Sequence, residues 1–208
     1  MIEIPEKYKV WDLETSGFNA PEDKILEIGL MVIEKGVCTE EKRWVLKHDF
    51  QIPEEITAIN GMTNEIMEAE GRDPKECLKE FMEYLFEDTM NLTHNGVKFD
   101  IPFLCKSVIH HVDDVDPFKI MELEGHLYKT CFDTAAIYKG MMMGVEQTKN
   151  ESFEFYAKRI LSTPVRGLKF NVSVCCEYFE IDKSAVTLHR ALGDVYLTNE
   201  IFKKLACK

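Results

Sequence analysis

The sequence lacks several features that would assign it to particular classes of protein. No apolar run among its 208 residues approaches the length that is needed to span a membrane. Residues 1–6 lack the basic and apolar regions of a secretory signal peptide. We therefore expect no membrane partner and no secretion, and a cytoplasmic or nuclear location.

Patterned cysteines and an excess of positive charge are missing as well. The seven cysteines are an odd, scattered set without a C-x-x-C pair, which favours reduced thiols over a disulfide framework. The 25 Lys and Arg residues are outnumbered by 37 Asp and Glu residues, so the formal net charge is −12. This balance argues against tight non-specific binding of nucleic acid by counterion release. It still permits a nucleic acid that is held locally through bound metal ions.

No repeat, low-complexity tract or linker marks a domain boundary, so residues 1–208 are expected to form a single domain. Strands are predicted over residues 8–14 and 25–33 and around residues 44–46 as an antiparallel meander, followed by strands at residues 90–93 and 127–132. Helices are predicted from apolar spacing and capping residues at residues 53–56, 74–86, 100–109, 134–138, 152–161, 171–179 and 195–205. This order predicts an α/β fold, a mixed sheet with helices on its faces, in which ligands bind at the strand ends.

The first strand ends in a pair of carboxylates. Asp12 and Glu14 are two residues apart, so a strand would project both from one face of the sheet. Two like charges this close repel each other unless a proton or a cation lies between them, and a hard divalent metal prefers such oxygen ligands. Thr15, Ser16 and Gly17 predict a turn whose backbone amides could approach a ligand closely.

Further candidate residues follow in chain order. Asp100 would lie at the N-terminus of a helix, just after the strand at residues 90–93. Asp194 lies in the last predicted helix region, with His189 five residues before it. In an ideal helix these two side chains would be about 140° apart around the axis, so we expect His189 in the loop or first turn before that helix, beside Asp194.

Three segments resemble the exonuclease motifs of the DEDDh family, which includes the proofreading subunit of bacterial replicative polymerase, ribonuclease T and oligoribonuclease. They are residues 12–17 (DLETSG), 94–104 (HNGVKFDIPFL) and 189–194 (HRALGD). Residues 56–63 and 132–134 resemble further recurring segments of that family. The sister group has a tyrosine four residues before the last aspartate, where this chain has Arg190, so the histidine group fits.

The resemblance implies a ribonuclease-H-like fold and hydrolysis of nucleic acid from the 3′ end to nucleoside 5′-monophosphates. It implies that Asp12, Glu14, Asp100 and Asp194 hold two Mg²⁺ or Mn²⁺ ions and that His189 is the general base. Two such ions about 4 Å apart can clamp the attacking and leaving oxygens of an in-line displacement. An imidazole with an ordinary pKa of about 6.5 is suited to proton abstraction near neutral pH.

The motifs also suggest residues that bind substrate. Leu13 and the turn at residues 15–17 would lie beside the terminal nucleotide, where backbone amides could recognise its 3′-hydroxyl group. Phe99 could stack on a base, or it could be a core phenylalanine behind the metal site. His94 and Asn95 are candidates for substrate contact, although closure of the turn is the role that we favour for them.

Two other clusters have more ordinary interpretations. Residues 110–116 (HHVDDVD) look like a metal cluster, but adjacent residues rarely converge on one ion, which favours a solvated loop. A basic cluster with interleaved aromatic residues could follow a phosphate backbone or could be a solvated face. Its members are Lys158, Arg159, Arg166 and Lys169, with Phe155, Tyr156 and Phe170.

The resulting hypothesis is a metal-dependent 3′-5′ exonuclease that acts on single-stranded DNA or RNA 3′ ends. The alternatives are a catalytically silent module on the same fold that binds nucleic acid or a protein partner, and an endonuclease on the related fold. The sequence does not decide between DNA and RNA. A polymerase or other protein partner, and a homodimer of the kind formed by ribonuclease T and oligoribonuclease, are further possibilities for which no interface can be identified.

Overall fold

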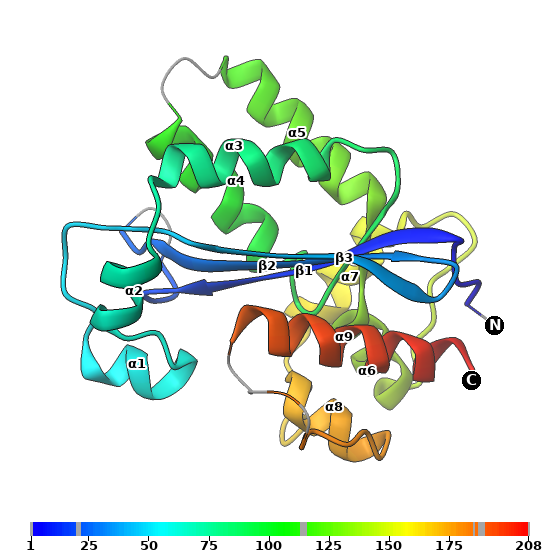
Figure 1. Cartoon of the computed structure of the whole chain (residues 1–208). Coiled ribbons are helices and arrows are strands. Elements are labelled where there is room, and N and C mark those ends of the chain that lie inside the picture. The colour runs from blue at the N-terminus through cyan, green and yellow to red at the C-terminus, as the bar shows by residue number, and fades with distance from the viewer. Residues whose placement is uncertain (1, 20–21, 113–115, 185, 187–189, 208) are drawn as a thin grey trace.

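The computed structural model describes residues 2–19, 22–112, 116–184, 186 and 190–207. Its centre is a five-stranded sheet with the strand order β3-β2-β1-β4-β5 (Figure 1). The first three strands pair antiparallel, whereas β4 pairs parallel with β1 and β5 pairs parallel with β4. The strands are β1 (Lys7–Thr15), β2 (Ile25–Glu34), β3 (Val37–Val45), β4 (Met90–Thr93) and β5 (Cys131–Asp133). The mixed sheet expected from the sequence is thereby confirmed.

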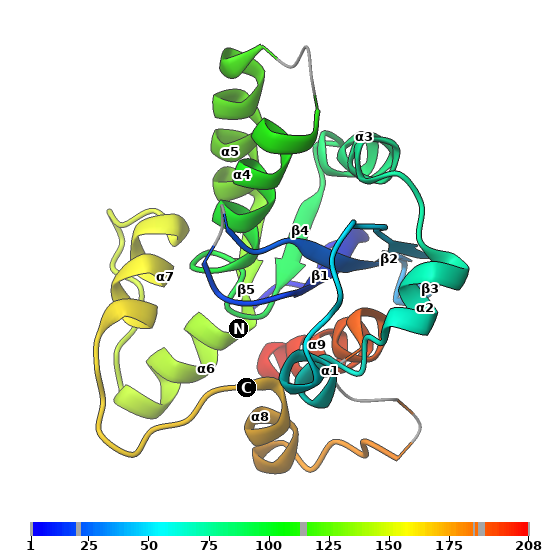
Figure 2. The same cartoon turned by 90° about the vertical axis from the view of Figure 1, so that its left-hand side faces the viewer.

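Helices cover both faces of this sheet. Helices α3, α4 and α5 lie on one face, and α9 runs along the other face with α8 and α6 beyond it (Figures 1 and 2). In the described part of the chain no helix is long and apolar enough to cross a bilayer. The helices are α1 (Glu54–Asn60), α2 (Asn64–Glu70), α3 (Pro74–Leu85), α4 (Asp100–His111), α5 (Pro117–Thr130), α6 (Thr134–Met143), α7 (Phe153–Ser162), α8 (Val172–Tyr178) and α9 (Ala191–Ala206).

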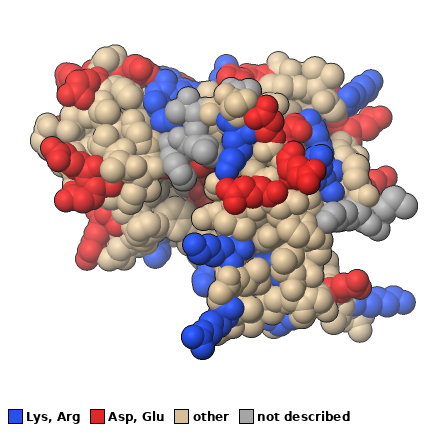
Figure 3. All heavy atoms as spheres, turned by 90° about the horizontal axis from the view of Figure 1, so that it is seen from below, with Lys and Arg blue, Asp and Glu red and all other residues tan. Residues whose placement is uncertain are grey.

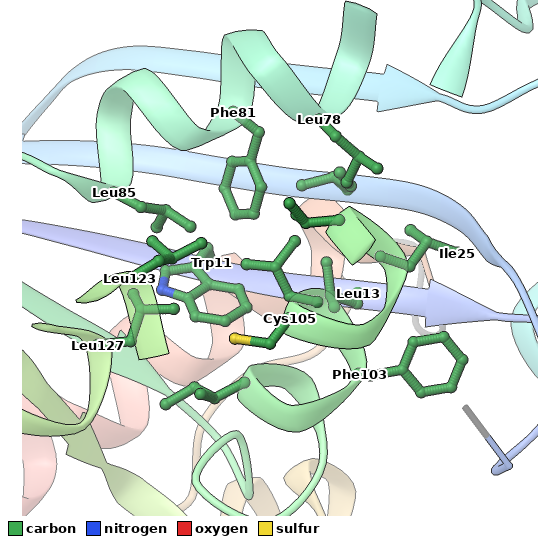
Figure 4. Packing of buried hydrophobic residues seen from close by; sticks show 14 of the residues in the cluster. Trp11, Leu13, Ile25, Leu78, Phe81, Leu85, Phe103, Cys105, Leu123 and Leu127 are labelled. Carbon is green, nitrogen blue, oxygen red and sulfur yellow. The ribbon is translucent and has the colours of Figure 1, made fainter. Parts of the chain in front are cut away.

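The alternation along β1 decides what each face of the sheet carries. Trp11 and Leu13 point into the core beneath α3, α4 and α5, where Trp11 meets the ring of Phe81 edge to face at 5.5 Å (Figure 4). Tyr8 and Val10 point the other way, into the cluster that contains Val195 and Phe202 of α9. Because side chains alternate along a strand, the even-numbered residues that follow Val10 also face α9.

One predicted strand is wrong in its position. Residues 127–130 form the last turn of α5, and only Cys131–Asp133 are extended. The physical reason is the helical spacing of Ile120, Leu123 and Leu127, whose side chains are buried. This helix was not predicted, although Asp116 followed by Pro117 is the same cap and first-turn proline that predicts α3 from residues 73–74.

Candidate active site

Three carboxylates meet where β1 ends and α9 begins. Asp12 and Glu14 extend from β1 on the face that α9 covers, and Asp194 comes from the first turn of α9. One oxygen from each carboxylate can be chosen so that all three atoms lie within 4.8 Å of one another. Residues that are about 180 positions apart in the sequence are thus brought together in the geometry of a shared cation site.

Asp100 is close to this cluster but faces it differently. It is the first residue of α4 and is almost completely buried. Its Oδ1 accepts a hydrogen bond of 3.2 Å from the backbone N–H of Leu13. Asp100 therefore joins α4 to the strand residue between Asp12 and Glu14, and in this conformation it occupies the Leu13 amide that the sequence suggested for substrate.

The electrostatics of these acids are unfavourable without a compensating charge. Burial raises the pKa of Asp12, and repulsion by Asp100, Glu14 and Asp194 raises it further. Burial, followed by the charges of Asp194 and Glu27, raises the pKa of Glu14 to about 9. Burial also raises the pKa of Asp100 to about 7, against the hydrogen bond from Leu13. A set of carboxylate oxygens that repel one another in a partly buried site fits a hard divalent cation such as Mg²⁺ or Mn²⁺.

The turn after Glu14 is held by contacts to distant residues. The Thr15 hydroxyl donates to the carbonyl of Gly17 at 2.6 Å, and the Thr15 carbonyl accepts from Nδ2 of Asn60 at 3.1 Å. Asn60 is buried at the end of α1, and its Oδ1 accepts from the Met62 N–H at 3.0 Å. The sequence marked residues 56–63 only by family resemblance, and their contact with the turn depends on a fold that local patterns do not reveal.

Ser16 and Gly17 close the same turn against the start of β2. The Ser16 N–H donates to the carbonyl of Lys24 at 2.8 Å, and its hydroxyl oxygen accepts from the Lys24 N–H at 2.9 Å. A Cβ atom at Gly17 would lie 2.3 Å from a carboxylate oxygen of Asp23. A side chain at position 17 would therefore require the Asp23 side chain to move, and the Ser16 amide is engaged within the protein.

His94 is buried with both ring nitrogens in contact with protein atoms. Nε2 lies 2.7 Å from the carbonyl oxygen of Phe170, which can only accept, so Nε2 carries a proton. Nδ1 lies 2.8 Å from the Thr134 hydroxyl. Burial lowers the pKa of His94 to about 4, which favours the neutral ring, and the same Thr134 hydroxyl donates to the Thr93 carbonyl at 3.0 Å. This arrangement ties β4 to α6 and to the segment at Phe170, and contact of His94 with substrate stays a prediction.

Asp133 fixes the turn that carries Asn95. Asn95 has a positive φ of 67°, and its N–H donates to Asp133 Oδ1 at 3.0 Å. The Val97 N–H donates to Asp133 Oδ2 at 3.0 Å, and the Ala136 N–H donates to Oδ1 at 3.1 Å as the cap of α6. Asp133 thus caps α6, and the same carboxylate shapes the turn that precedes Asp100.

Phe99 lies between the core and the surface. Its ring is 5.4 Å from that of buried Phe103 and 6.1 Å from that of Phe18. Phe18 follows the turn at Gly17 and is 81% exposed. Sequence reasoning did not single out Phe18, since a lone aromatic residue after a turn has no distinguishing pattern. Together the rings of Phe18 and Phe99 form an aromatic pair beside the carboxylate cluster.

The profile of the RNase T exonuclease family matches residues 10–116, a span that contains Asp12, Glu14 and Asp100. The chain belongs to the RNase T exonuclease family. The fourth candidate carboxylate, Asp194, lies beyond the matched span, and the fold places it beside Asp12 and Glu14.

Relatives of this exonuclease domain occur within larger proteins. A PolC-type DNA polymerase III of Clostridium perfringens is 29% identical over 205 residues, which cover 96% of this chain and 13% of that protein. A PolC-type polymerase of Ureaplasma parvum is 23% identical over 198 residues, covering 94% of this chain and 11% of that protein. The 3′-5′ exonuclease DinG of Bacillus subtilis is 33% identical over 101 residues, covering 48% of this chain and 10% of that protein. The chain thus spans about an eighth or less of the length of these relatives.

Solved structures of exonuclease I share the fold. One matches with a TM-score of 0.73 at 17% identity, covering 98% of this chain and 41% of that chain. Another, E. coli exonuclease I in complex with a dA16 oligonucleotide, matches with a TM-score of 0.71 at 17% identity, covering 97% of this chain and 41% of that chain. These likenesses confirm the ribonuclease-H-like fold.

A pocket of about 520 Å³ adjoins the cluster of this exonuclease domain. Asp194 lines it together with His94, Asn95, Lys169 and Ser173. Asn95 and Lys169 therefore lie in the same hollow as Asp194.

The predicted basic cluster is only partly available for phosphate groups. Lys158 pairs with Glu154 at 2.8 Å, and Arg159 donates twice to Glu151 at 2.8 Å. Seen from the side that carries α9 and α8, the lower part of the surface carries mostly positive side chains, whereas negative side chains predominate at its left edge (Figure 3). Lys169 lines the pocket beside Asp194, together with the aromatic Phe170 of the same cluster.

His189, the predicted general base, lies outside the described residues. Its neighbour Arg190 is described and holds the start of α9. The role of His189 in this exonuclease domain stays a prediction.

Proposed function

We propose that the chain is a metal-dependent 3′-5′ exonuclease that releases nucleoside 5′-monophosphates from the 3′ ends of single strands. The observation that carries this proposal is the convergence of Asp12, Glu14 and Asp194 oxygens within 4.8 Å. Membership of the exonuclease family and the 3′-5′ exonuclease named among the relatives support the direction of attack.

In the proposed reaction a water molecule attacks the terminal phosphodiester and the bond from phosphorus to the 3′-oxygen of the preceding nucleotide breaks. Asp12, Glu14 and Asp194 would hold divalent cations, with Asp100 beside them, and we propose two ions of Mg²⁺ or Mn²⁺. Bound cations supply positive charge that stabilises the attacking and leaving oxygens. His189 would accept the proton of the attacking water.

The substrate that we propose is a flexible single strand, and DNA is the first to test. The relatives include DNA polymerases, and the solved neighbours include a complex with a DNA oligonucleotide. The exposed ring of Phe18 against Phe99 offers a stacking surface that would accept any base. The net charge of −12 disfavours a long duplex held by many phosphate contacts. A polymerase partner and a homodimer stay predictions.

The test uses 5′-labelled and 3′-labelled DNA and RNA, single-stranded and duplex, in Mg²⁺, Mn²⁺ or EDTA. We expect a ladder of 5′-labelled products that shortens from the 3′ end, immediate release of the 3′ label as mononucleotide, and no reaction in EDTA. Asp12→Asn keeps the shape of the side chain and removes its charge. Mutation of residues that only orient metal ligands typically lowers metal affinity or activity by 10–100-fold. We therefore expect Asp12→Asn, which changes a proposed ligand itself, to lower the rate by at least about a hundredfold.

Three outcomes would contradict the proposal. Wild-type protein that binds labelled strands without releasing nucleotides in either metal would instead be a silent binding module. Cleavage of circular single-stranded DNA would indicate an endonuclease, because an exonuclease has no end at which to begin. Full activity of Asp12→Asn would remove the carboxylate cluster from the mechanism.

A further inference from the structure

The first turn of α9, which supplies Asp194, is capped by Glu27, a residue of strand β2. Arg190 occupies the N-cap position, and its side chain makes no capping hydrogen bond. Instead Glu27 of β2 accepts a hydrogen bond from the Ala191 N–H on Oε2 at 3.1 Å. The guanidinium of Arg190 donates to both oxygens of the same carboxylate, at 3.1 and 2.7 Å. Three hydrogen bonds therefore join β2 to the start of α9.

Glu27 is completely buried, so its charge is held by these partners. Arg43 from β3 pairs with it on the other side. Burial acts to raise the pKa of Glu27, but the hydrogen bonds from Arg190 and Arg43 outweigh it and leave the pKa below its ordinary value. A buried carboxylate that is paired with two arginines and a backbone N–H fixes these groups in place, because its oxygens exchange hydrogen bonds from water for hydrogen bonds from the protein. We call this arrangement of Glu27, Arg190 and the Ala191 N–H the anchor.

The backbone of α9 rests directly on β2 beside this anchor. A Cβ atom at Gly29 would lie 2.6 Å from the carbonyl carbon of Ala191, so only glycine permits this approach. In the antiparallel register Glu27 is opposite Glu14, and Gly29 is opposite Asp12. The residues that seat α9 are thus the direct cross-strand neighbours of the two β1 carboxylates.

We propose that Glu27 is a positioning residue of the active site, one that acts with Arg190 to hold the first turn of α9 so that Asp194 meets Asp12 and Glu14. Asp194 is three residues after Ala191, and its N–H donates to the Arg190 carbonyl at 3.0 Å. Any shift of this turn moves Asp194 relative to the strand, and with it the affinity for a divalent cation. This inference rests on the proposed metal-dependent function.

The negative charge of Glu27 could by itself strengthen cation binding, and the experiment must distinguish this effect from the positioning of Asp194. Removal of a negative charge near a cation site weakens binding by Coulomb's law alone. Removal of the positive charge of Arg190 should by the same law strengthen binding, whereas loss of the anchor should weaken it. The two explanations therefore predict opposite signs for an Arg190 variant.

The test measures Mn²⁺ binding to the metal-stripped protein without substrate, from the electron paramagnetic resonance signal of free Mn²⁺. Binding is preferred to turnover because Arg190 adjoins the predicted base His189 in the sequence. We expect Glu27→Gln and Arg190→Gln each to weaken binding by on the order of tenfold, since partners that orient metal ligands are typically worth 10–100-fold. The double variant should lose no more than either single variant, because the two residues act as one unit.

Two controls separate the anchor from nearby charge. Arg43→Gln removes a positive charge and one partner of Glu27, but it removes no contact with α9. We expect its Mn²⁺ affinity to stay within about threefold of wild type, a limit chosen because residues that orient metal ligands change affinity by 10–100-fold. Glu80→Gln removes a carboxylate that accepts from Trp44 and Arg72 on the far side of the sheet, and it should leave affinity unchanged. If Glu27→Gln does not fold, Arg190→Lys keeps the positive charge, loses the two-pronged contact, and should still weaken binding.

Amide hydrogen exchange at residues 191–195, measured in EDTA, shows whether the first turn of α9 is held in place when no metal is bound. We expect faster exchange there in the Glu27 and Arg190 variants and wild-type exchange in Arg43→Gln. Wild-type Mn²⁺ affinity and exchange in both anchor variants would overturn the positioning role and leave the exonuclease proposal standing. Tighter Mn²⁺ binding in Arg190→Gln would overturn it in favour of simple electrostatics. Wild-type protein that neither binds Mn²⁺ nor shortens 3′ ends would instead overturn the proposed function itself.

Discussion

At the scale of single residues, His94 couples the fold to pH. The pKa of His94 in the folded protein is about 4, below the ordinary value of about 6.5, so the unfolded chain binds the proton first as pH falls. Its contribution to stability is complete above about pH 6.5 and is lost as pH falls toward 4, by up to about 3 kcal/mol. We expect the stability advantage of wild type over His94→Gln to shrink between pH 7 and pH 4.5 in urea unfolding. The other titratable groups are the same in wild type and in His94→Gln. Curves of unfolding free energy against pH that run parallel for the two proteins would therefore contradict a lowered pKa of His94.

The sequence predicted that two carboxylates of the candidate site share one face because their spacing is local, whereas the family resemblance added Asp100 and Asp194 to them. Asp12 and Glu14 are two residues apart on a strand, and that period alone places them on one face. The roles of Glu27 and Asn60 were not predicted, because they arise from contacts with Ala191 and Thr15, which lie 164 and 45 residues away in the chain. A glutamate in an apolar strand and an asparagine at a helix end have no local pattern that reveals such partners.

At the scale of elements, Asp133 joins three pieces of the fold. One buried carboxylate accepts from the backbone of the turn at Asn95 and Val97 and caps α6. Asp133→Ala would leave these buried N–H groups without an acceptor, so we expect a loss of about 3–5 kcal/mol in the free energy of unfolding. Asp73→Ala removes an exposed cap of α3 that accepts one hydrogen bond, and it should cost only about 1 kcal/mol. Equal losses in the two variants would show that Asp133 is merely a cap.

The elements themselves were predicted where period and capping agreed. The meander and most helices follow from alternation, helical spacing and N-cap residues, and the structure confirms them. The strand predicted at residues 127–132 was wrong because a short apolar segment suits either a strand or the last turn of a helix. The length of α5 was decided by burial of Ile120, Leu123 and Leu127 against the core, which is a tertiary effect.

At the scale of the whole molecule, the two faces of the sheet have different tasks. The face beneath α3, α4 and α5 buries Trp11, Leu13 and Phe81 in the largest apolar cluster of the described residues. The α9 face holds Tyr8 and Val10 against Phe202 and then presents acids at the strand end. A like-charged, partly buried cluster destabilises the metal-free fold, and the apolar face offsets that cost. The acids of the proposed site and the largest apolar cluster thus lie on opposite sides of the same strand.

This division predicts how metal ions change global stability. A cation that binds only the folded protein stabilises it by about 2.7 kcal/mol at a hundredfold excess over its Kd, or roughly 5–10 °C in Tm for a chain of this size. We expect Mn²⁺ to raise the Tm of wild type by this amount relative to EDTA. Asp12→Asn should respond far less, and in EDTA it should be at least as stable as wild type, because an amide at this position ends the repulsion by Glu14 and Asp194. Scanning calorimetry of both proteins with and without Mn²⁺ measures the difference directly, and an equal Mn²⁺ response in the two would place the cation elsewhere.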